Sequence, residues 1–278
     1  MVPLGMDKSL EIENADFWSE PCGTNKLISL ELANNPLENI DKFDAWYFEY
    51  YPYLLDQLKK LDLNANVLEI GIGMGSVTRL ISQKTKKLTC VDIAPGAIDF
   101  VSKSIPPDRK IDFVCESILN YDSKVKFDVI IAIGPLHHTG DLLTSLTKVK
   151  SLLKINGTML IMVYYAFQPR RIIKHPIRSL KEFGQTLMIG NYKQISFSEK
   201  DEKIRGKADS NSHGIPAPYS SFNSRKVFSQ DKDIKYKISL NNFHRVPILS
   251  RFLPRNFFLK YFSKFFGCDI YAVGKHKK

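Results

Sequence analysis

The sequence is poor in cysteine, and its cysteines fall in no spacing typical of a disulfide framework or a metal site. The four in 278 residues are Cys22, Cys90, Cys115 and Cys268. Pairs such as C-x-x-C, which hold zinc or form redox-active disulfides, do not occur among them. We therefore expect reduced thiols, as in most cytoplasmic proteins, and no metal site.

Long apolar runs and low-complexity tracts are also missing. No stretch approaches the roughly 18 apolar residues that a membrane-spanning helix needs. The first ten residues, MVPLGMDKSL, lack the cationic and then apolar blocks of a secretory signal. Hydrophobic residues still make up 44% of the chain, which is enough for a sizeable core. We expect a cytoplasmic, globular protein, and its oligomeric state is left open.

Charge is distributed unevenly along the chain, whose net charge is +11. Residues 1–60 carry 5 basic and 11 acidic side chains, whereas residues 166–278 carry 23 basic and 8 acidic ones. A cationic C-terminal third attracts an anionic substrate, a nucleic acid or an anionic lipid surface. It is equally consistent with a solvated basic surface, so charge alone does not select a partner.

Apolar runs of strand length alternate with helical segments over residues 61–165. Near-continuous, β-branched runs are typical of strands buried on both faces of a parallel sheet. Their alternation with helices predicts right-handed βαβ units and a doubly wound α/β core. The runs are NVLEIG (66–71), KLTCVDI (87–93), DFVCES (112–117), FDVIIAI (127–133) and TMLIMVYY (158–165).

Three further segments flank this core. Residues 1–60 are predicted to form a helical lid rich in aromatic side chains. Residues 166–230 are polar and basic and too long for a plain connection, so we expect a substrate-shaping insertion. Residues 231–278 are expected to close the core with two strands, 233–240 and 268–274. The predicted fold is thus α/β, with a doubly wound, seven-stranded, mostly parallel sheet.

The first predicted strand leads directly into three glycines. Glycine tolerates positive φ and lets a ligand approach the backbone closely. A helix is expected immediately afterwards, and its free N-terminal amides suit polar or anionic ligand groups. The next strand ends in Asp92, which is placed to accept hydrogen bonds from both hydroxyls of a ribose. The sequence therefore predicts a nucleotide-type pocket around Gly71, Gly73 and Gly75.

Two details distinguish this loop from a dinucleotide-binding loop. Ser76 stands where such a loop usually has its third glycine or an alanine, and Glu69 lies two residues before the first glycine. The form E-x-G-x-G-x-G resembles motif I of the class I methyltransferases that depend on S-adenosylmethionine (SAM). The resemblance implies SAM as cofactor, with Glu69 beneath its methionine end. It also implies that Asp92 binds the ribose and that Ile93 lies against the adenine.

The resemblance continues along the chain. The segment 113–117, FVCES, is similar to the one that lies beside the adenine amino group in this family. Here Glu116, followed by Ser117, replaces the usual shorter aspartate. The segment 127–141, FDVIIAIGPLHHTGD, is similar to the fourth strand and the substrate-facing loop, with Ile133 on the cofactor side. Four motifs in the family's order therefore carry the resemblance: the glycine loop, the strand end at Asp92, and the segments 113–117 and 127–141.

The N-terminal segment resembles the lead-in of a bacterial methyltransferase subgroup. The segment 17–26, FWSEPCGTNK, contains the subgroup's Trp-x-x-Pro-Cys-Gly-Thr signature, and FDAWYFEYYPYLL (43–55) follows it. Such a lead-in often folds over the cofactor as a lid. We expect Tyr51 to contact the sulfonium and Tyr47 to reach the substrate, because aromatic faces attract cations. Packing of these rings within helices is the alternative.

Methyl transfer requires an aligned acceptor and, for some acceptors, a base that removes a proton. His137 follows the fourth strand and is predicted as that base, with a structural role as the alternative. His138 is expected to pack or to contact substrate. Arg170, His213 and Tyr219 are expected to shape the acceptor pocket, where an arginine could hold a carboxylate or phosphate.

The expected function is methylation of a small molecule on oxygen or another heteroatom. The rivals are a nucleic-acid methyltransferase, a non-catalytic SAM-binding module and an NAD-dependent enzyme. Against the first, the fourth strand is not followed by the Asn-Pro-Pro-Tyr type of motif that holds a flipped base. The aromatic segment 256–266 is expected to pack on the sheet as a covering helix. Alternatively it lies on a membrane surface and meets a lipid or quinone substrate.

Overall fold

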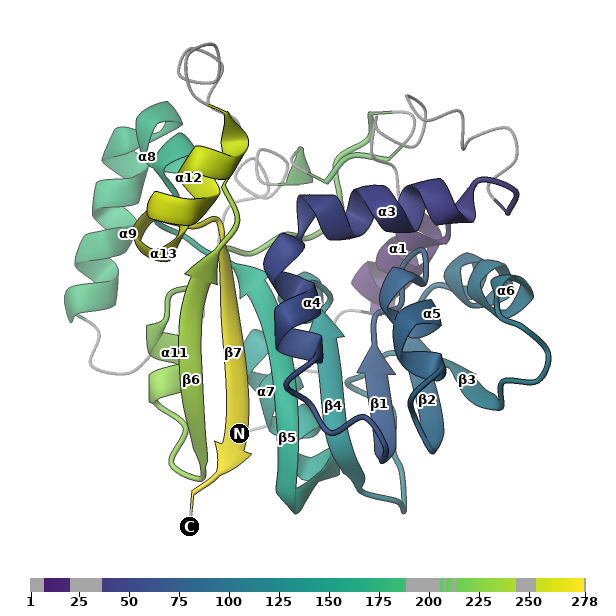
Figure 1. The fold of residues 1–278 in the computed structure, drawn as a ribbon. Coiled ribbons are helices and arrows are strands. Elements are labelled where there is room, and N and C mark those ends of the chain that lie inside the picture. The colour runs from purple at the N-terminus through teal and green to yellow at the C-terminus, as the bar shows by residue number, and fades with distance from the viewer. Residues whose placement is uncertain are drawn as a thin grey trace.

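The structure is a computed structural model that describes residues 8–20, 37–188, 206–207, 209–211, 214–243 and 254–277. Within these residues the chain forms a seven-stranded sheet in the order β3-β2-β1-β4-β5-β7-β6, with helices on both faces (Figure 1). Strands β1 to β5 pair in parallel, and β7 pairs antiparallel with both β5 and β6. The predicted fold class is confirmed. The strands are β1 (Asn66–Ile70), β2 (Lys87–Asp92), β3 (Ile111–Cys115), β4 (Phe127–Ile133), β5 (Leu153–Tyr164), β6 (Ile234–Asn241) and β7 (Asp269–His276).

The strand order reverses between β1 and β4, which lie side by side near the middle of the sheet. The connections that follow these two strands leave in opposite directions, so a crevice opens at their carboxyl ends. Strand β5 begins five residues earlier than the apolar run predicted. Its first residue, Leu153, pairs with Phe127, and pairing resumes between Thr158 and Val129 after an irregularity in register. The four residues between Leu153 and Thr158 carry no apolar run, which is why the sequence pattern missed them.

Each face of the sheet has its own hydrophobic core. On one face, β-branched strand residues pack against α4 (Pro52–Leu58), α5 (Ser76–Ser82) and α6 (Pro95–Ser104) through Leu54, Ile81 and Val101, all fully buried. On the other face, α7 (Leu142–Leu152) and α11 (Lys226–Ser229) cover the strands. Figure 1 shows α4 in front of the sheet and α7 behind it. Burial of both faces explains the near-continuous apolar strands.

Two helices of the lead-in, α1 (Lys8–Ser19) and α3 (Ile40–Tyr50), lie beyond the carboxyl ends of β1 and β4 (Figure 1). Helix α1 rests directly on α6, because the backbone amide of Gly96 donates to the Ser19 hydroxyl at 3.2 Å. Helix α3 is held to α5 by an ion pair between Asp44 and Arg79, and the Ser76 hydroxyl donates to the same carboxylate at 2.6 Å. The lead-in is therefore anchored to the helices that flank the crevice.

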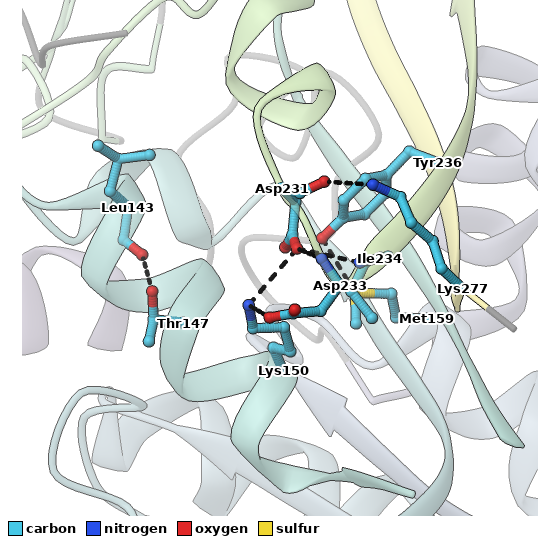
Figure 2. A network of polar contacts seen from close by, with 9 residues as sticks. All are labelled: Leu143, Thr147, Lys150, Met159, Asp231, Asp233, Ile234, Tyr236 and Lys277. Carbon is cyan, nitrogen blue, oxygen red and sulfur yellow. Dashed lines mark hydrogen bonds and ion pairs between the residues drawn. The ribbon is translucent and has the colours of Figure 1, made fainter. Parts of the chain in front are cut away.

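A polar network ties the C-terminal strands to α7 (Figure 2). The ammonium group of Lys150 lies 2.8 Å from the carboxylate of Asp233 and 3.4 Å from that of Asp231. The Asp231 carboxylate also accepts the backbone amides of Asp233 and Ile234, where β6 begins. Lys277, just after β7, donates to the Asp231 carbonyl at 3.0 Å. This network fixes where β6 begins and β7 ends, away from the crevice.

The aromatic segment near the C-terminus is not the single covering helix that we expected, although part of it does pack against β6. It forms two short helices, α12 (Arg255–Tyr261) and α13 (Ser263–Phe266), which meet at Phe262. The break turns the rings in different directions: Phe258 is buried, whereas Phe265 is 71% exposed. No helix among the described residues is long and apolar enough to cross a membrane. The remaining helices are η1 (Leu136–His138), α8 (Pro169–Lys174) and α9 (Pro176–Met188).

The glycine after β1 gives a direct test of the packing at the crevice. Gly71 has φ +70°, and a Cβ built on it would lie 2.4 Å from the Cβ of Pro135. Gly214 has a similar φ of +75°, but no atom lies within 4 Å of its added Cβ. Gly214→Ala should therefore cost only the backbone strain of about 1–2 kcal/mol. Gly71→Ala should cost clearly more, by about 1–3 kcal/mol for the steric overlap.

The measurement is the free energy of unfolding of both variants and the native chain in urea. Equal losses for the two variants would show that Pro135 does not pack tightly against the loop after β1.

Candidate functional site

A cavity occupies the crevice at the carboxyl ends of β1, β2 and β4. Its floor is the loop after β1 and its walls are the ends of neighbouring strands, η1, α1 and α3. Most of the residues predicted from the cofactor motif line this one cavity, although they are spread over more than 60 positions of sequence. They are Glu69, Gly71, Gly73, Asp92, Ile93, Glu116, Ser117, Ile133 and Tyr51.

The loop after β1 is built from left-handed glycines. Gly71, Gly73 and Gly75 have φ values of +70°, +51° and +78°, a region that other residue types enter only with strain. Gly75 does not line the cavity but is the N-cap of α5. This conformation turns successive backbone amides toward the end of β2, where Asp92 lies. The glycine spacing predicted from the sequence thus corresponds to one backbone turn with its amides on one side.

Asp92 gathers three backbone amides on its carboxylate. One oxygen accepts from Ile72 at 2.7 Å and from Gly73 at 3.4 Å, and the other accepts from Ala94 at 2.9 Å. The side chain is buried but still lines the cavity. Burial raises the pKa of Asp92, while the amides of Ala94, Ile72 and Gly73 act in the opposite direction. A carboxylate held in this way can accept further hydrogen bonds from hydroxyl groups in the cavity.

Glu69 is the second carboxyl group of the floor, and only 4% of it is exposed. Burial raises the pKa of Glu69 to about 8. The thiol of Cys90, whose own pKa burial raises well above its ordinary value, lies 3.9 Å from one carboxyl oxygen. Glu69 is therefore mostly a neutral acid at neutral pH, and a cation placed above it would favour its ionised form.

The two histidines of η1 differ in their access to the cavity. His137 is completely buried and does not line the cavity, and its ring centroid lies 4.3 Å from that of His138 and 4.0 Å from that of Tyr164. Burial lowers the pKa of His137 well below its ordinary value. The assignment of His137 as the base is therefore wrong, because a 3₁₀ turn directs adjacent side chains differently and His137 points into the core. His138 lines the cavity instead.

His138 is held in one orientation by its surroundings. Its Nδ1 lies in hydrogen-bond contact with the carbonyl oxygen of Tyr219, and its ring meets Trp18 at 4.9 Å. Since a carbonyl oxygen only accepts, Nδ1 carries the hydrogen and donates it. Burial lowers the pKa of His138, so the ring is neutral and its Nε2 bears a free lone pair.

Two residues that the sequence did not suggest complete this side of the cavity. Asp209 lies 3.9 Å from Nε2 of His138 through its Oδ2, and its Oδ1 accepts the hydroxyl hydrogen of Tyr164 at 2.7 Å. Burial raises the pKa of Asp209. Tyr164 could have been found as the last residue of β5, next to β4. Asp209 has no such signal, because its short described stretch reaches the cavity only through tertiary folding.

The other predicted substrate residues have different outcomes. Tyr47 lines the cavity, whereas Tyr219 contributes its backbone carbonyl through His138. Arg170 lies in α8, but its side chain falls outside the part of the chain that the structure describes, as do His213 and residues 21–24 of the lead-in signature. The neighbouring Arg171 is buried and donates to the carboxylate of Glu182 at 2.6 Å, away from the cavity lining.

Comparison with known proteins gives a consistent picture. Residues 68–159 match the family model for a methyltransferase domain. A malonyl-[acyl-carrier protein] O-methyltransferase of Priestia megaterium is 28% identical over 140 residues, which cover 49% of this chain and 51% of that protein. Nodulation protein S of Rhizobium tropici is 29% identical over 91 residues, which cover 33% of this chain and 38% of that protein. The chain thus spans about half of the first relative's length and less of the second's.

The solved structure of DhpI in complex with S-adenosylhomocysteine (SAH) has the same fold. It superposes with a TM-score of 0.55 over 97% of this chain and 98% of DhpI, at 12% sequence identity. The matched segment, 68–159, contains the glycine loop, the end of β2 and η1, so the family match covers the floor of the cavity. Residues 68–159 thus match a methyltransferase domain, and the sheet order around them supports the class I, SAM-dependent type.

Proposed function

We propose that this chain transfers a methyl group from SAM to a small-molecule acceptor inside the cavity described above. The observation that carries the proposal is that a single cavity joins two chemically different halves. One half has the carboxylates and glycine amides suited to a nucleoside and a cation. The other has a neutral histidine with a free lone pair, a buried carboxylate and a tyrosine hydroxyl. A transferase needs both halves to share one space.

The cavity floor fits the cofactor. Asp92 offers carboxylate oxygens to ribose hydroxyls, and the glycine loop lets a ligand approach the backbone without side-chain interference. Ile93 and Ser117 line the same half and would lie against the adenine. Glu69 lines the same floor, and the resemblance to the family implies that it lies beneath the methionine end. When bound, SAM supplies an electrophilic methyl group on a positively charged sulfur.

Aromatic rings of the lead-in line the cavity opposite the floor. Tyr47 and Tyr51 meet at 5.0 Å between ring centroids, and Phe43 stacks on Tyr47 at 6.2 Å. All three line the cavity, together with Trp46. The faces of such rings attract a cation and exclude water from it. We therefore propose that α1 and α3 act as the lid of the site.

His138 supplies the proton acceptor at the other end. Its Nδ1 hydrogen is committed to the Tyr219 carbonyl, so Nε2 is the nitrogen available to the cavity. The side chain of Asn14 donates to the His138 carbonyl at 3.3 Å and ties the turn to α1. A rigid, neutral imidazole of this kind can take a proton from an acceptor group that it contacts. His138 therefore takes the role first assigned to His137.

The names of the relatives do not select an acceptor for this chain. One is named as a malonyl-[acyl-carrier protein] O-methyltransferase, and another, NodS of Bradyrhizobium japonicum, as an N-methyltransferase. The residues that face the acceptor here come from α1, η1, the end of β5 and Asp209. Most of these lie outside the segment that matches the family model, residues 68–159. We propose a small-molecule acceptor, free or carrier-bound, in a cytoplasmic setting.

Asp92→Asn tests the cofactor assignment. The substitution replaces a charged acceptor by a neutral one that also carries donors, so hydrogen bonds worth about 1.5–3 kcal/mol are weakened. We expect the affinity for SAH, measured by calorimetry, to fall about 10- to 100-fold. Asp112→Asn is the matched control, because Asp112 lies on the adjacent strand β3 and is 59% exposed in a surface ion pair with Lys87.

Unfolding midpoints measured alongside separate lost binding from lost structure. Unchanged SAH affinity in a folded Asp92→Asn protein, or equal losses in both variants, would contradict the cofactor assignment.

Glu69→Gln tests the electrostatics of the floor. Because the pKa of Glu69 is about 8, the free protein carries a neutral acid at about pH 6. A bound sulfonium favours the carboxylate, so binding of SAM releases a proton. The affinity of the native chain for SAM should then rise by up to about tenfold per pH unit as the pH approaches 8, and level off above it. Glu69→Gln should show little pH dependence.

The titration is best made between about pH 5.5 and 7.5, where the α-amino group of SAM stays protonated. A native affinity that is flat over this range would show that Glu69 does not sense the cofactor charge.

A further inference from the structure

Two hydrogen-bond acceptors converge at the acceptor end of the cavity. Nε2 of His138 and Oδ2 of Asp209 are 3.9 Å apart, too far for a direct hydrogen bond. Because Nδ1 of the neutral ring carries the hydrogen, Nε2 presents a lone pair rather than a donor. Among the described residues, the Oδ2 atom receives a long contact of 3.4 Å from the Ser220 hydroxyl, whereas Oδ1 accepts from Tyr164 at 2.7 Å.

Such a pair requires donors from a ligand. A hydroxyl group has a single hydrogen and can satisfy only one of the two acceptors at a time. A carboxylate or phosphate has none to give at neutral pH and is repelled by the charge of Asp209. An ammonium group carries several N–H donors and can reach His138 and Asp209 together. Its hydrogen bond to the Asp209 carboxylate is charge-assisted and therefore among the stronger ones.

The remaining walls are also suited to a cation. Trp18 and Tyr164 line the cavity beside His138 and Asp209 and present aromatic rings to it. Aromatic faces stabilise ammonium groups by about 0.5–2 kcal/mol, more when water is excluded. Among the described residues, no lysine or arginine lines the cavity, and its acidic side chains are Glu69, Asp92, Glu116 and Asp209.

We infer that the methyl acceptor is an amine, bound as its ammonium form between Asp209 and Nε2 of His138. This rests on the proposed function and specifies the substrate class of the same site. The sequence had suggested an arginine-held carboxylate or phosphate; the side chain of Arg170 lies outside the described residues, and the buried Arg171 pairs with Glu182. Asp209 binds and orients the amine, and His138 is the catalytic residue that touches the nitrogen.

The reaction balances with these two side chains. The bound ammonium gives one proton to Nε2 of His138, which leaves a nitrogen lone pair. That lone pair forms the N–C bond to the methyl group while the S–C bond breaks and its electron pair remains on sulfur. The product is a methylated ammonium, and His138 returns its proton to solvent when the product leaves. No oxidant, reductant or metal enters this balance.

The test uses three probes that share one aromatic frame: benzylamine, benzyl alcohol and benzoate. Each is titrated into the SAH-saturated full chain at about pH 7, where benzylamine is protonated, and binding is followed by ligand-observed NMR. We expect benzylamine to bind at least about tenfold more tightly than benzyl alcohol, and benzoate not to compete. Asp209→Asn should remove this preference while the affinity for SAH stays unchanged.

Asp122→Asn is the matched control, because Asp122 is a 93% exposed carboxylate that does not line the cavity. It should keep the preference for benzylamine. Equal binding of amine and alcohol by the native chain, tighter binding of benzoate, or an amine preference that survives Asp209→Asn would overturn the inference. Failure of the native chain to bind SAH would instead overturn the proposed function, so the two failures are distinguishable.

Discussion

The contact between the Asp92 carboxylate and the backbone of the glycine loop organises this protein. Asp92 is the last residue of β2, and its carboxylate accepts hydrogen bonds from the backbone amides of Ile72 and Gly73, which follow β1. It also accepts one from the amide of Ala94, the N-cap residue of α6. Burial of the Asp92 carboxylate without such partners would destabilise the fold. Without Asp92, in turn, the amides of the glycine loop would lack the acceptor that holds the loop in one conformation. The contact therefore joins two parallel strands at their carboxyl ends and shapes the floor between them.

The same loop determines where the acceptor side lies. Gly71 packs so closely against Pro135 that no side chain fits between them. Pro135 immediately precedes η1, so the position of the floor sets the position of His138. His138 in turn is held by the Tyr219 carbonyl and by the ring of Trp18 on α1. A chain of tight contacts thus runs from the cofactor half of the cavity to the proposed amine site.

The parts that could be predicted from the sequence are those defined by local chemistry and strand order. Glu69, Asp92 and the glycines follow strands that are recognisable from their apolar runs, and parallel strands bring their carboxyl ends together. The histidines show where this approach stops, because a difference of one residue in a 3₁₀ turn decides which ring reaches the cavity. Asp209 could not have been found, since its contacts with Tyr164 and His138 join segments 45 and 71 positions apart.

The most direct measurement is a crystal structure of the full chain in complex with SAH. It would show which carboxylate holds the ribose and what faces the sulfur. We expect the ribose hydroxyls to lie about 2.6–3.2 Å from the Asp92 carboxylate. We also expect the sulfur to lie above Glu69, with the side that carries the methyl group in SAM directed toward His138 and Asp209. A ribose held elsewhere, or a sulfur facing away from His138, would contradict the proposed function.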